Sequence, residues 1–279
     1  MGNLEISSQQ AKQLEIKPKT HWSPGVEESC LILSAQGSYE RAAQDLEKLT
    51  GIQVSSSTQQ RLVQRHEWSA PQVEEPIEEM SLDGGMIRLR TPLGQSCEWR
   101  EYKAVSLHGL GAAAFFKDKD QLLEWLNSQP RAPRVACLGD GHDGVWSLFA
   151  QVGEKHQRIE ILDWYHLQQN AQPVRGSPIQ LALITALLWR GQALCARSYL
   201  LSNRLLRATN FVGYLQRHQH RIIDYAARQA AGGSVGSGSV ESLVKQIAAR
   251  VKISGAQWSR VNVPKVLSHR CAYLNGTLY

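Results

Sequence analysis

The stretch RVACLGDGHDGVWSLFAQVGEKHQRIEILDWYHL, residues 134–167, decides the fold. It contains two short apolar runs, each of which ends in an acid and is followed by a helical pattern. Apolar runs of this length are typical of parallel strands that are buried on both faces of a sheet. The stretch therefore predicts two strand-helix units, with Asp140 and Asp163 at the carboxyl ends of their strands.

Three strand patterns and a helix precede these units. An antiparallel meander is predicted from three stretches, MSLDGGMIRLRT (80–91), CEWREYKAVSLHGL (97–110) and GAAAFFKD (111–118). A helix is predicted from the next stretch, KDQLLEWLNSQ (119–129). The resulting order, βββ-α-β-α-β-α, favours an α/β fold in which a mixed sheet is flanked by helices.

The first 70 residues are expected to form a helical region. Three helical patterns cover residues 24–66, and a break at Gly51 followed by serines that can cap a helix gives the outline of a helix-turn-helix. The third pattern carries Arg61 and Arg65, which are candidates for DNA contact. An ordinary helical hairpin fits the same outline. The acidic, proline-containing residues 71–79 are interpreted as a linker.

Residues 168–231 carry few strand signals and are expected to form a helical insertion. GGSVGSGS, which follows, is interpreted as a flexible break, and VESLVKQIAARVKI (240–253) predicts an amphipathic helix that docks on the sheet. The catalytic core is therefore expected to consist of residues 80–167 and 232–279.

Charge is distributed unevenly along the chain. The net charge is +6, but residues from Leu167 onward contain 14 Lys and Arg against two acids, a net charge of +12. This distribution indicates a polyanion-binding surface, although a solvated basic face has the same composition. The five cysteines are scattered and contain no C-x-x-C pair, and no long apolar run is present. We therefore expect a cytoplasmic protein without disulfides, a cysteine zinc site or membrane contact.

Three acids lie where a strand ends or a helix begins: Asp83 in SLDGG, Asp140 in CLGDGHDG and Glu241 in GSVES. Carboxylate oxygens are the ligands that Mg²⁺ prefers, and two ions held by such acids can activate an attacking oxygen and stabilise a leaving one. The acids therefore predict a Mg²⁺ (or Mn²⁺) site for phosphoryl transfer. Each acid also has a plainer interpretation, because Asp before Gly favours turns and Glu suits the first turn of a helix. Asp143 is a second choice for Asp140.

Asp163 and His166 lie three residues apart where strand gives way to helix. His166 is a candidate for positioning an acidic ligand or contacting phosphate, and Asp163 is an alternative metal ligand to Asp140. A purely structural hydrogen bond between the two fits equally well.

Five parts of the sequence together resemble the ISKra group of bacterial insertion-sequence transposases. They are the motifs SLDGG, GDGHDGVW, ILDWYHL and GSGSVES and the closing stretch VKISGAQWSRVNVPKVLSHRCAYLNG. The resemblance covers about residues 24–279. It implies a ribonuclease-H-like core, an Asp-Asp-Glu metal triad at Asp83, Asp140 and Glu241, and a D-x-x-H motif at Asp163 and His166. It also implies partners: the inverted repeats at the element ends, target DNA, and further copies of the chain on DNA in the bacterial nucleoid. Members are commonly longer at the N-terminus and in the insertion, so the chain is expected to be a truncated copy.

The closing basic segment fits DNA binding. Lys245, Arg250, Lys252 and Arg260 are candidate phosphate contacts, and Trp258 is a candidate for base stacking. A solvated helix face and a core tryptophan are the plainer interpretations. The leading hypothesis is a transposase that cuts and joins DNA. The alternatives are a non-catalytic DNA-binding remnant and a structure-selective nuclease on the same core.

Overall fold

The computed structural model describes residues 6–14 and 22–278, so residues 1–5 and 15–21 of the expected helical region lie outside the described part. The chain divides into two compact units. The sheet unit consists of Gln72–Gly85 and Glu101–Lys245, and the terminal unit consists of the described residues of Met1–Pro71, Met86–Arg100 and Gln246–Tyr279. In the described part, no helix is both long enough and apolar enough to cross a membrane.

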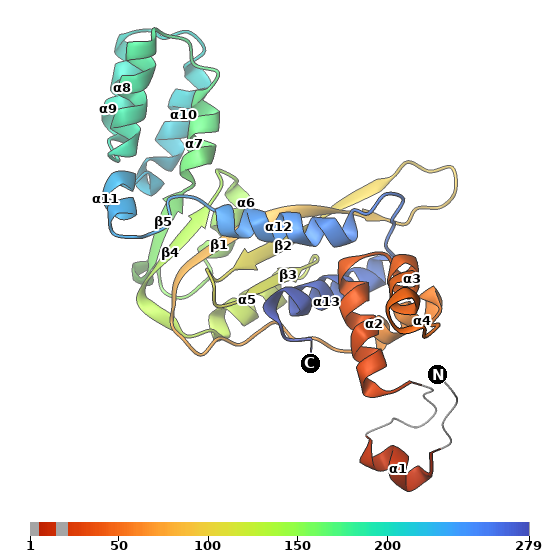
Figure 1. The fold of residues 1–279 in the computed structure, drawn as a ribbon. Helices are drawn as coiled ribbons and strands as arrows, with labels where there is room; N and C mark the ends of the chain where they lie inside the picture. The colour runs from red at the N-terminus through yellow and green to blue at the C-terminus, as the bar shows by residue number, and fades with distance from the viewer. Residues whose placement is uncertain (1–5, 15–21, 279) are drawn as a thin grey trace. The chain divides into compact units, whose positions relative to one another are not determined.

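Five strands form one sheet, in the order β3-β2-β1-β4-β5 (Figure 1). The strands are β1 (Ile77–Leu89), β2 (Glu98–Ser106), β3 (Ala112–Phe115), β4 (Arg131–Gly139) and β5 (Arg158–Leu162). β4 runs parallel to both β1 and β5, whereas β2 and β3 are antiparallel. Helices α5 (Lys119–Ser128), α6 (Asp143–Phe149) and α7 (Trp164–Ala171) follow β3, β4 and β5. The predicted element order and the mixed sheet flanked by helices are thereby confirmed.

The glycines after Asp83 have a packing role. β1 continues through Gly84 and Gly85, so no turn forms there. A methyl group added to Gly84 would lie 2.2 Å from a carboxylate oxygen of Glu101, and one added to Gly85 would lie 2.1 Å from the ring of Tyr102. The glycines therefore let β1 approach these side chains of β2 closely.

The helical elements expected over residues 168–231 are α8 (Pro178–Trp189), α9 (Ala193–Ser202), α10 (Thr209–His218) and α11 (Tyr225–Ala230). α7, α10, α9 and α8 pack in succession, as Figure 1 shows at the end of the sheet unit that carries β5. A cluster of aromatic rings from α7, α8 and α11 joins them: the ring centroids of Trp164 and Trp189 are 4.7 Å apart, and those of Trp164 and Tyr225 are 5.1 Å apart. Stacked and edge-on aromatic pairs of this kind stabilise helix packing.

The segment GGSVGSGS is held in place, which corrects its interpretation as a flexible break. The backbone N–H of Trp164 donates to Val235 O at 3.0 Å, and Ser237 is 2% exposed and bonded to Asp163. Ser234 N–H donates to the carboxylate of Glu79, which also accepts from Arg228. Glu79 belongs to β1, although residues 71–79 were interpreted as a linker.

In the terminal unit, α2 (Pro24–Gln36), α3 (Tyr39–Thr50) and α4 (Ser56–Arg65) form the three helices expected over residues 24–66. Gly51 ends α3 in the left-handed conformation (φ 72°), and Ser55 caps α4 by accepting from Thr58 N–H. The three helices share an apolar core: Cys30, Leu31, Leu46, Val54, Leu62 and Val63. A separate short helix, α1 (Ser8–Gln13), contains no buried residue.

Two basic residues near the end of the chain are buried against the end of α2, and one of them, Arg250, was expected to contact phosphate. Arg250, in α12 (Gly238–Val251), is 1% exposed and donates to Ser34 O at 2.6 Å. Arg270, in α13 (Val263–Asn275), is 8% exposed and donates to Ala35 O at 3.0 Å. Carbonyls in the last turn of a helix lack intrahelical partners and carry partial negative charge, which cations stabilise. The phosphate-binding role expected of Arg250 is therefore corrected to a structural one.

His269 of α13 provides a test of this packing. It is fully buried, with ring Nε2 3.0 Å from Leu31 O, and burial, helped by the nearby charge of Arg250, lowers the pKa of His269 to about 3. The unfolded chain takes up this proton at the ordinary value near 6.5, so the stabilisation is present above pH 6.5 and is lost as pH falls toward 3. At pH 4.5 the loss should reach about 2–3 kcal/mol, since each pKa unit corresponds to about 1.4 kcal/mol.

We expect His269→Asn to be less stable than the wild type at pH 7.5 but to lose less stability on acidification. Chemical denaturation at pH 7.5 and pH 4.5, followed by tryptophan fluorescence, measures both values. Equal acid sensitivity in the two proteins would show that His269 is not held neutral.

Candidate active site

Three acids follow aligned residues on three neighbouring parallel strands. Leu82 of β1 pairs with Gly139 of β4, and Gly139 pairs in turn with Leu162 of β5. The residues that follow these are Asp83, Asp140 and Asp163. Because neighbouring strands lie about 4.8 Å apart, this register puts the three acids in a row across the sheet, level with the carboxyl ends of β4 and β5. Asp83 lies midway along β1, which continues to Leu89, so its expected place at a strand end is corrected.

Asp83 and Asp140 each use one carboxylate oxygen locally. Oδ1 of Asp83 accepts from the backbone N–H of Gly84 at 2.6 Å, and Oδ1 of Asp140 accepts from the backbone N–H of His142 at 2.9 Å. Asp140 therefore also stabilises a turn, as the plainer interpretation of Asp before Gly predicted. Among the described residues, neither Oδ2 atom has a hydrogen-bond partner, so each acid keeps an oxygen for a ligand.

The charges of the expected triad act on one another. Burial raises the pKa of Asp83 most, and the negative charges of Asp140 and Glu241 raise it further. Glu241 lies in the first turn of α12, with its side chain about one-third exposed. Like charges that perturb one another in this way lie close in space, and a dication relieves their repulsion.

Asp163 has a different environment from the other two strand-end acids. Its side chain is fully buried. Oδ1 accepts from the backbone N–H of His166 at 2.9 Å, and Oδ2 accepts from both the backbone N–H and the hydroxyl of Ser237. Burial alone would raise the pKa of Asp163, but the interaction with the His166 side chain and these hydrogen bonds outweigh it and lower the pKa to about 2. Asp163 therefore caps α7 and fixes the segment that leads into α12.

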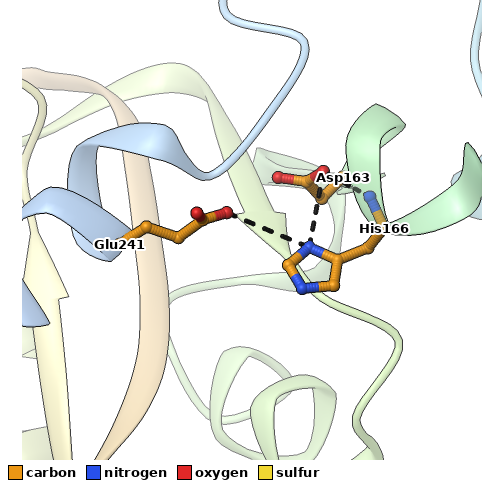
Figure 2. Close-up of side chains that lie close together, drawn as sticks. All are labelled: Asp163, His166 and Glu241. Atoms are coloured by element: carbon orange, nitrogen blue, oxygen red, sulfur yellow. Dashed lines mark hydrogen bonds and ion pairs between the residues drawn. The ribbon is translucent and has the colours of Figure 1, made fainter. Parts of the chain in front are cut away.

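His166 lies between two acids, as Figure 2 shows. Its Nδ1 is 3.5 Å from Oδ1 of Asp163 and 4.0 Å from Oε1 of Glu241. The first distance is long for a hydrogen bond, so the interaction is mainly that of a charged imidazole with a carboxylate. Interaction with Asp163, supported by the charges of Asp140 and Glu241, raises the pKa of His166. This position suits His166 to orient Glu241.

Two sets of residues can be compared as metal ligands. In the described part of the chain, ligand atoms of Asp163, His166 and Glu241 lie within 4.8 Å of one another. Imidazole suits transition metals better than Mg²⁺, and the carboxylate of Asp163 already accepts three hydrogen bonds. Asp83, Asp140 and Glu241 offer only oxygen atoms, two of them without partners, which is the donor set that Mg²⁺ or Mn²⁺ prefers. In donor chemistry the second set suits Mg²⁺ or Mn²⁺ better, although its ligand atoms do not all lie within 4.8 Å of one another in the described part of the chain.

Tyr214 of α10 reaches the loop that follows Asp140. Its hydroxyl is buried and has no hydrogen-bond partner among the described residues. A methyl group added to Gly141 would lie 2.4 Å from this hydroxyl, so the ring covers Gly141 closely. Burial, followed by the charges of Asp140 and Asp163, raises the pKa of Tyr214 and keeps the hydroxyl protonated. The insertion thus contributes a side chain beside the acids.

Because Tyr214 lies so close to Gly141, we expect any side chain at position 141 to lower the stability of the protein. Gly141→Ala should destabilise the protein by about 1–3 kcal/mol because the ring of Tyr214 must shift. Thermal unfolding measures the effect, with Gly213→Ala as the matched control, since a methyl group there meets nothing within 4 Å. In a Tyr214→Ala background the cost of Gly141→Ala should disappear, and a cost that persists would contradict the packing described here.

The remaining residues expected to bind DNA have mixed environments. Arg61, Arg65, Lys245 and Lys252 are exposed. Arg260 is exposed and forms an ion pair with Glu98 at 2.7 Å. Trp258 is 9% exposed, and its indole N–H donates to Val251 O at 2.9 Å. Base stacking by Trp258 is therefore corrected to a core role, whereas the exposed cations remain candidates.

Two functional candidates were not found from the sequence. Ser237 holds Asp163 but lies in a glycine- and serine-rich stretch whose composition is typical of linkers. Tyr214 lies in an ordinary helical pattern 74 residues after Asp140, and no local signal connects the two. Comparison with known proteins adds no residue, because no protein-family model matches the chain and no curated protein matches it.

Proposed function

We propose that this protein is a divalent-cation-dependent DNA transposase that cuts and joins phosphodiester bonds at the ends of a mobile element. The observation that carries the proposal is the alignment of Asp83, midway along β1, with Asp140, which follows the end of β4, together with the charges of Asp140 and Glu241 that raise the pKa of Asp83. An acid cluster that raises the pKa of its own member is more stable with a cation bound than without one.

The topology supports the finer proposal of a ribonuclease-H-like core. The order βββ-α-β-α-β-α, a helical insertion after the D-x-x-H segment, and a final acid at the start of α12 all agree with the family that the sequence resembles. Asp83 and Asp140 lie on neighbouring strands, as expected of two ligands that share an ion.

In this proposal Asp83, Asp140 and Glu241 hold Mg²⁺ or Mn²⁺. When bound, such ions activate an attacking water or 3′-hydroxyl and stabilise the leaving oxygen of the phosphodiester. His166 is a positioning residue that orients Glu241, and Asp163 fixes both α7 and the segment before α12. Tyr214 covers the loop after Asp140 and excludes water from that side of the site.

The proposed partners are the terminal inverted repeats of the element, target DNA and further copies of this chain, since two ends must be joined in one complex. The basic composition of the chain after Leu167 supports DNA as the ligand. The exposed cations Arg61, Arg65, Lys245, Lys252 and Arg260 are the proposed phosphate contacts, and the proposed site of action is the bacterial nucleoid in the cytoplasm.

A cleavage assay tests the proposal. Purified protein is incubated with labelled duplexes that carry the element end or a scrambled end, in Mg²⁺, in Mn²⁺ and in EDTA. Specific nicks that require the metal and the element end are expected. DNA that is bound but never cut would favour a non-catalytic binding protein, and cutting without joining would favour a nuclease.

A further inference from the structure

A groove with a volume of about 690 Å³ lies between α7 and α10. One wall contains Gln169 and Asn170 from α7, and the other contains Asn210, Gly213 and Arg217 from α10. All five residues are exposed. A groove of this size is in the range of ordinary ligand sites.

The lining matches the chemistry of a nucleotide. Side-chain amides both donate and accept hydrogen bonds, as the edges of bases do, and Gln169, Asn170 and Asn210 supply three of them. Arg217 makes no ion pair within the described part of the chain, so its guanidinium is free for a phosphate. Phe211 and Tyr214 give the groove an aromatic floor.

The groove approaches the acids through Tyr214. Tyr214 lines it and also covers Gly141, the residue after Asp140. On α7, Gln169 and Asn170 lie one turn after His166, and the Asn170 amide donates to His166 O at 2.9 Å. A DNA strand that passes from Asp140 across the ring of Tyr214 therefore reaches the groove.

The surrounding insertion carries charge of the sign that a nucleic acid requires. Residues 168–231 contain eight arginines and a single acid, Asp224. Two of these arginines, Arg221 and Arg228, pair with Glu160 and Glu79, so the other six supply the positive charge. Asp224 is occupied in capping α11. No carboxylate lines the groove.

We propose that the groove between α7 and α10 binds a short unpaired segment of DNA that continues from the phosphodiester held at the acids. This inference rests on the proposed function and extends it, because it assigns the helical insertion the role of separating and holding single-stranded DNA beside the cut. The amides and the ring of Tyr214 in the lining suit base edges and base faces, which an unpaired strand exposes, so the proposed occupant is a single strand.

Gly213 allows a direct test. An added methyl group at this position meets nothing within 4 Å, so a side chain can be introduced there. Gly213→Leu is expected to narrow the groove, and Gly213→Ala is the matched control that leaves it open. Arg217→Gln is a second variant that removes charge and keeps the groove's shape. Circular dichroism verifies that each variant folds.

Fluorescence anisotropy in EDTA compares a blunt duplex with the same duplex carrying a short single-stranded tail. The wild type and Gly213→Ala should bind the tailed duplex about tenfold more tightly, in line with the usual contribution of a contacted base. Gly213→Leu should lose this preference and keep its affinity for the blunt duplex, and Arg217→Gln should reduce the preference. No preference in the wild type, or an unchanged preference in Gly213→Leu, would overturn the proposal.

Because the assay contains no metal, its outcome is separate from that of cleavage. Metal-dependent cleavage without a preference for the tailed duplex would contradict the groove proposal and leave the proposed catalytic function in place. A tail preference without cleavage would keep the groove and remove the proposed catalytic function.

Discussion

Asp140→Asn is expected to lower metal-dependent DNA cleavage by about 10³-fold while leaving DNA affinity within a factor of about two. Stabilisation of transition-state charge by a bound ion contributes several kcal/mol, and about 4 kcal/mol corresponds to a 10³-fold change in rate. Asparagine keeps the oxygen that accepts from His142 N–H, so the loop should retain its conformation. Asp83→Asn and Glu241→Gln should have effects of the same order.

The matched control is Asp143→Asn, which makes the same chemical change three residues later on an exposed side chain. It should keep nearly full activity. In EDTA, Asp140→Asn should unfold at a temperature no lower than the wild type, because removing one charge relieves repulsion with Asp83. Equal loss of activity in Asp140→Asn and Asp143→Asn, or loss of DNA binding along with cleavage, would contradict the metal-ligand role of Asp140.

Asp163→Ala is expected to destabilise the sheet unit by about 3–5 kcal/mol. The substitution removes the cap of α7, which contributes about 1 kcal/mol, and leaves the buried N–H and hydroxyl of Ser237 without an acceptor, which costs about 1–3 kcal/mol for each group. The melting temperature should fall by about 10 °C. Differential scanning calorimetry measures the change.

Asp224→Ala is the control for this prediction. Asp224 also caps a helix, accepting from Ala227 N–H at 2.9 Å, but it is exposed and makes no buried bond. It should cost only about 1 kcal/mol. A change in Asp163→Ala as small as that in Asp224→Ala would show that Asp163 is not the structural anchor described here, and it would reopen the possibility that Asp163 is a metal ligand.

The order of strands and helices was predictable because it follows from short-range patterns. The apolar run before Asp140 is a buried parallel strand, whereas the run before Asp163 is a parallel edge strand of which only the last two residues are buried. The serine and glycine signals around residues 51–57 cap and end helices as expected. Helix α13 was not anticipated, because its buried residues include Arg270 and His269, which break the apolar pattern of the sequence. Their burial depends on carbonyls of α2 more than 230 residues earlier.

The candidate site was predictable only in part. Asp83, Asp140 and Glu241 were selected from strand ends, a helix start and a family resemblance. The strand register aligns Asp83 with Asp140, whereas the described ligand atoms that lie within 4.8 Å of one another are those of Asp163, His166 and Glu241. The separate role of Asp163 depends on Ser237, which is 74 residues away, and the role of Tyr214 depends on the folding of the insertion. No local sequence pattern predicts either of these contacts.

Charge alone also misled the assignment of DNA contacts. The basic segment after Glu241 has no acids, so each cation was expected to face phosphate. Arg250 and Arg270 instead bond to backbone carbonyls, which need no acidic partner. A basic composition therefore identifies a polyanion-binding surface only after the cations that bond to the backbone have been set aside.

The central claim is that Asp83, Asp140 and Glu241, and not Asp163 and His166, hold the catalytic cation. Calorimetric titration with Mn²⁺ tests it most directly in the wild type, Asp140→Asn and Asp163→Asn, each at a temperature where it is folded. The wild type and Asp163→Asn should bind Mn²⁺ with similar affinity, and Asp140→Asn should bind it at least about tenfold more weakly. Unchanged binding in Asp140→Asn, together with lost binding in Asp163→Asn, would contradict the claim and move the ion to Asp163, His166 and Glu241.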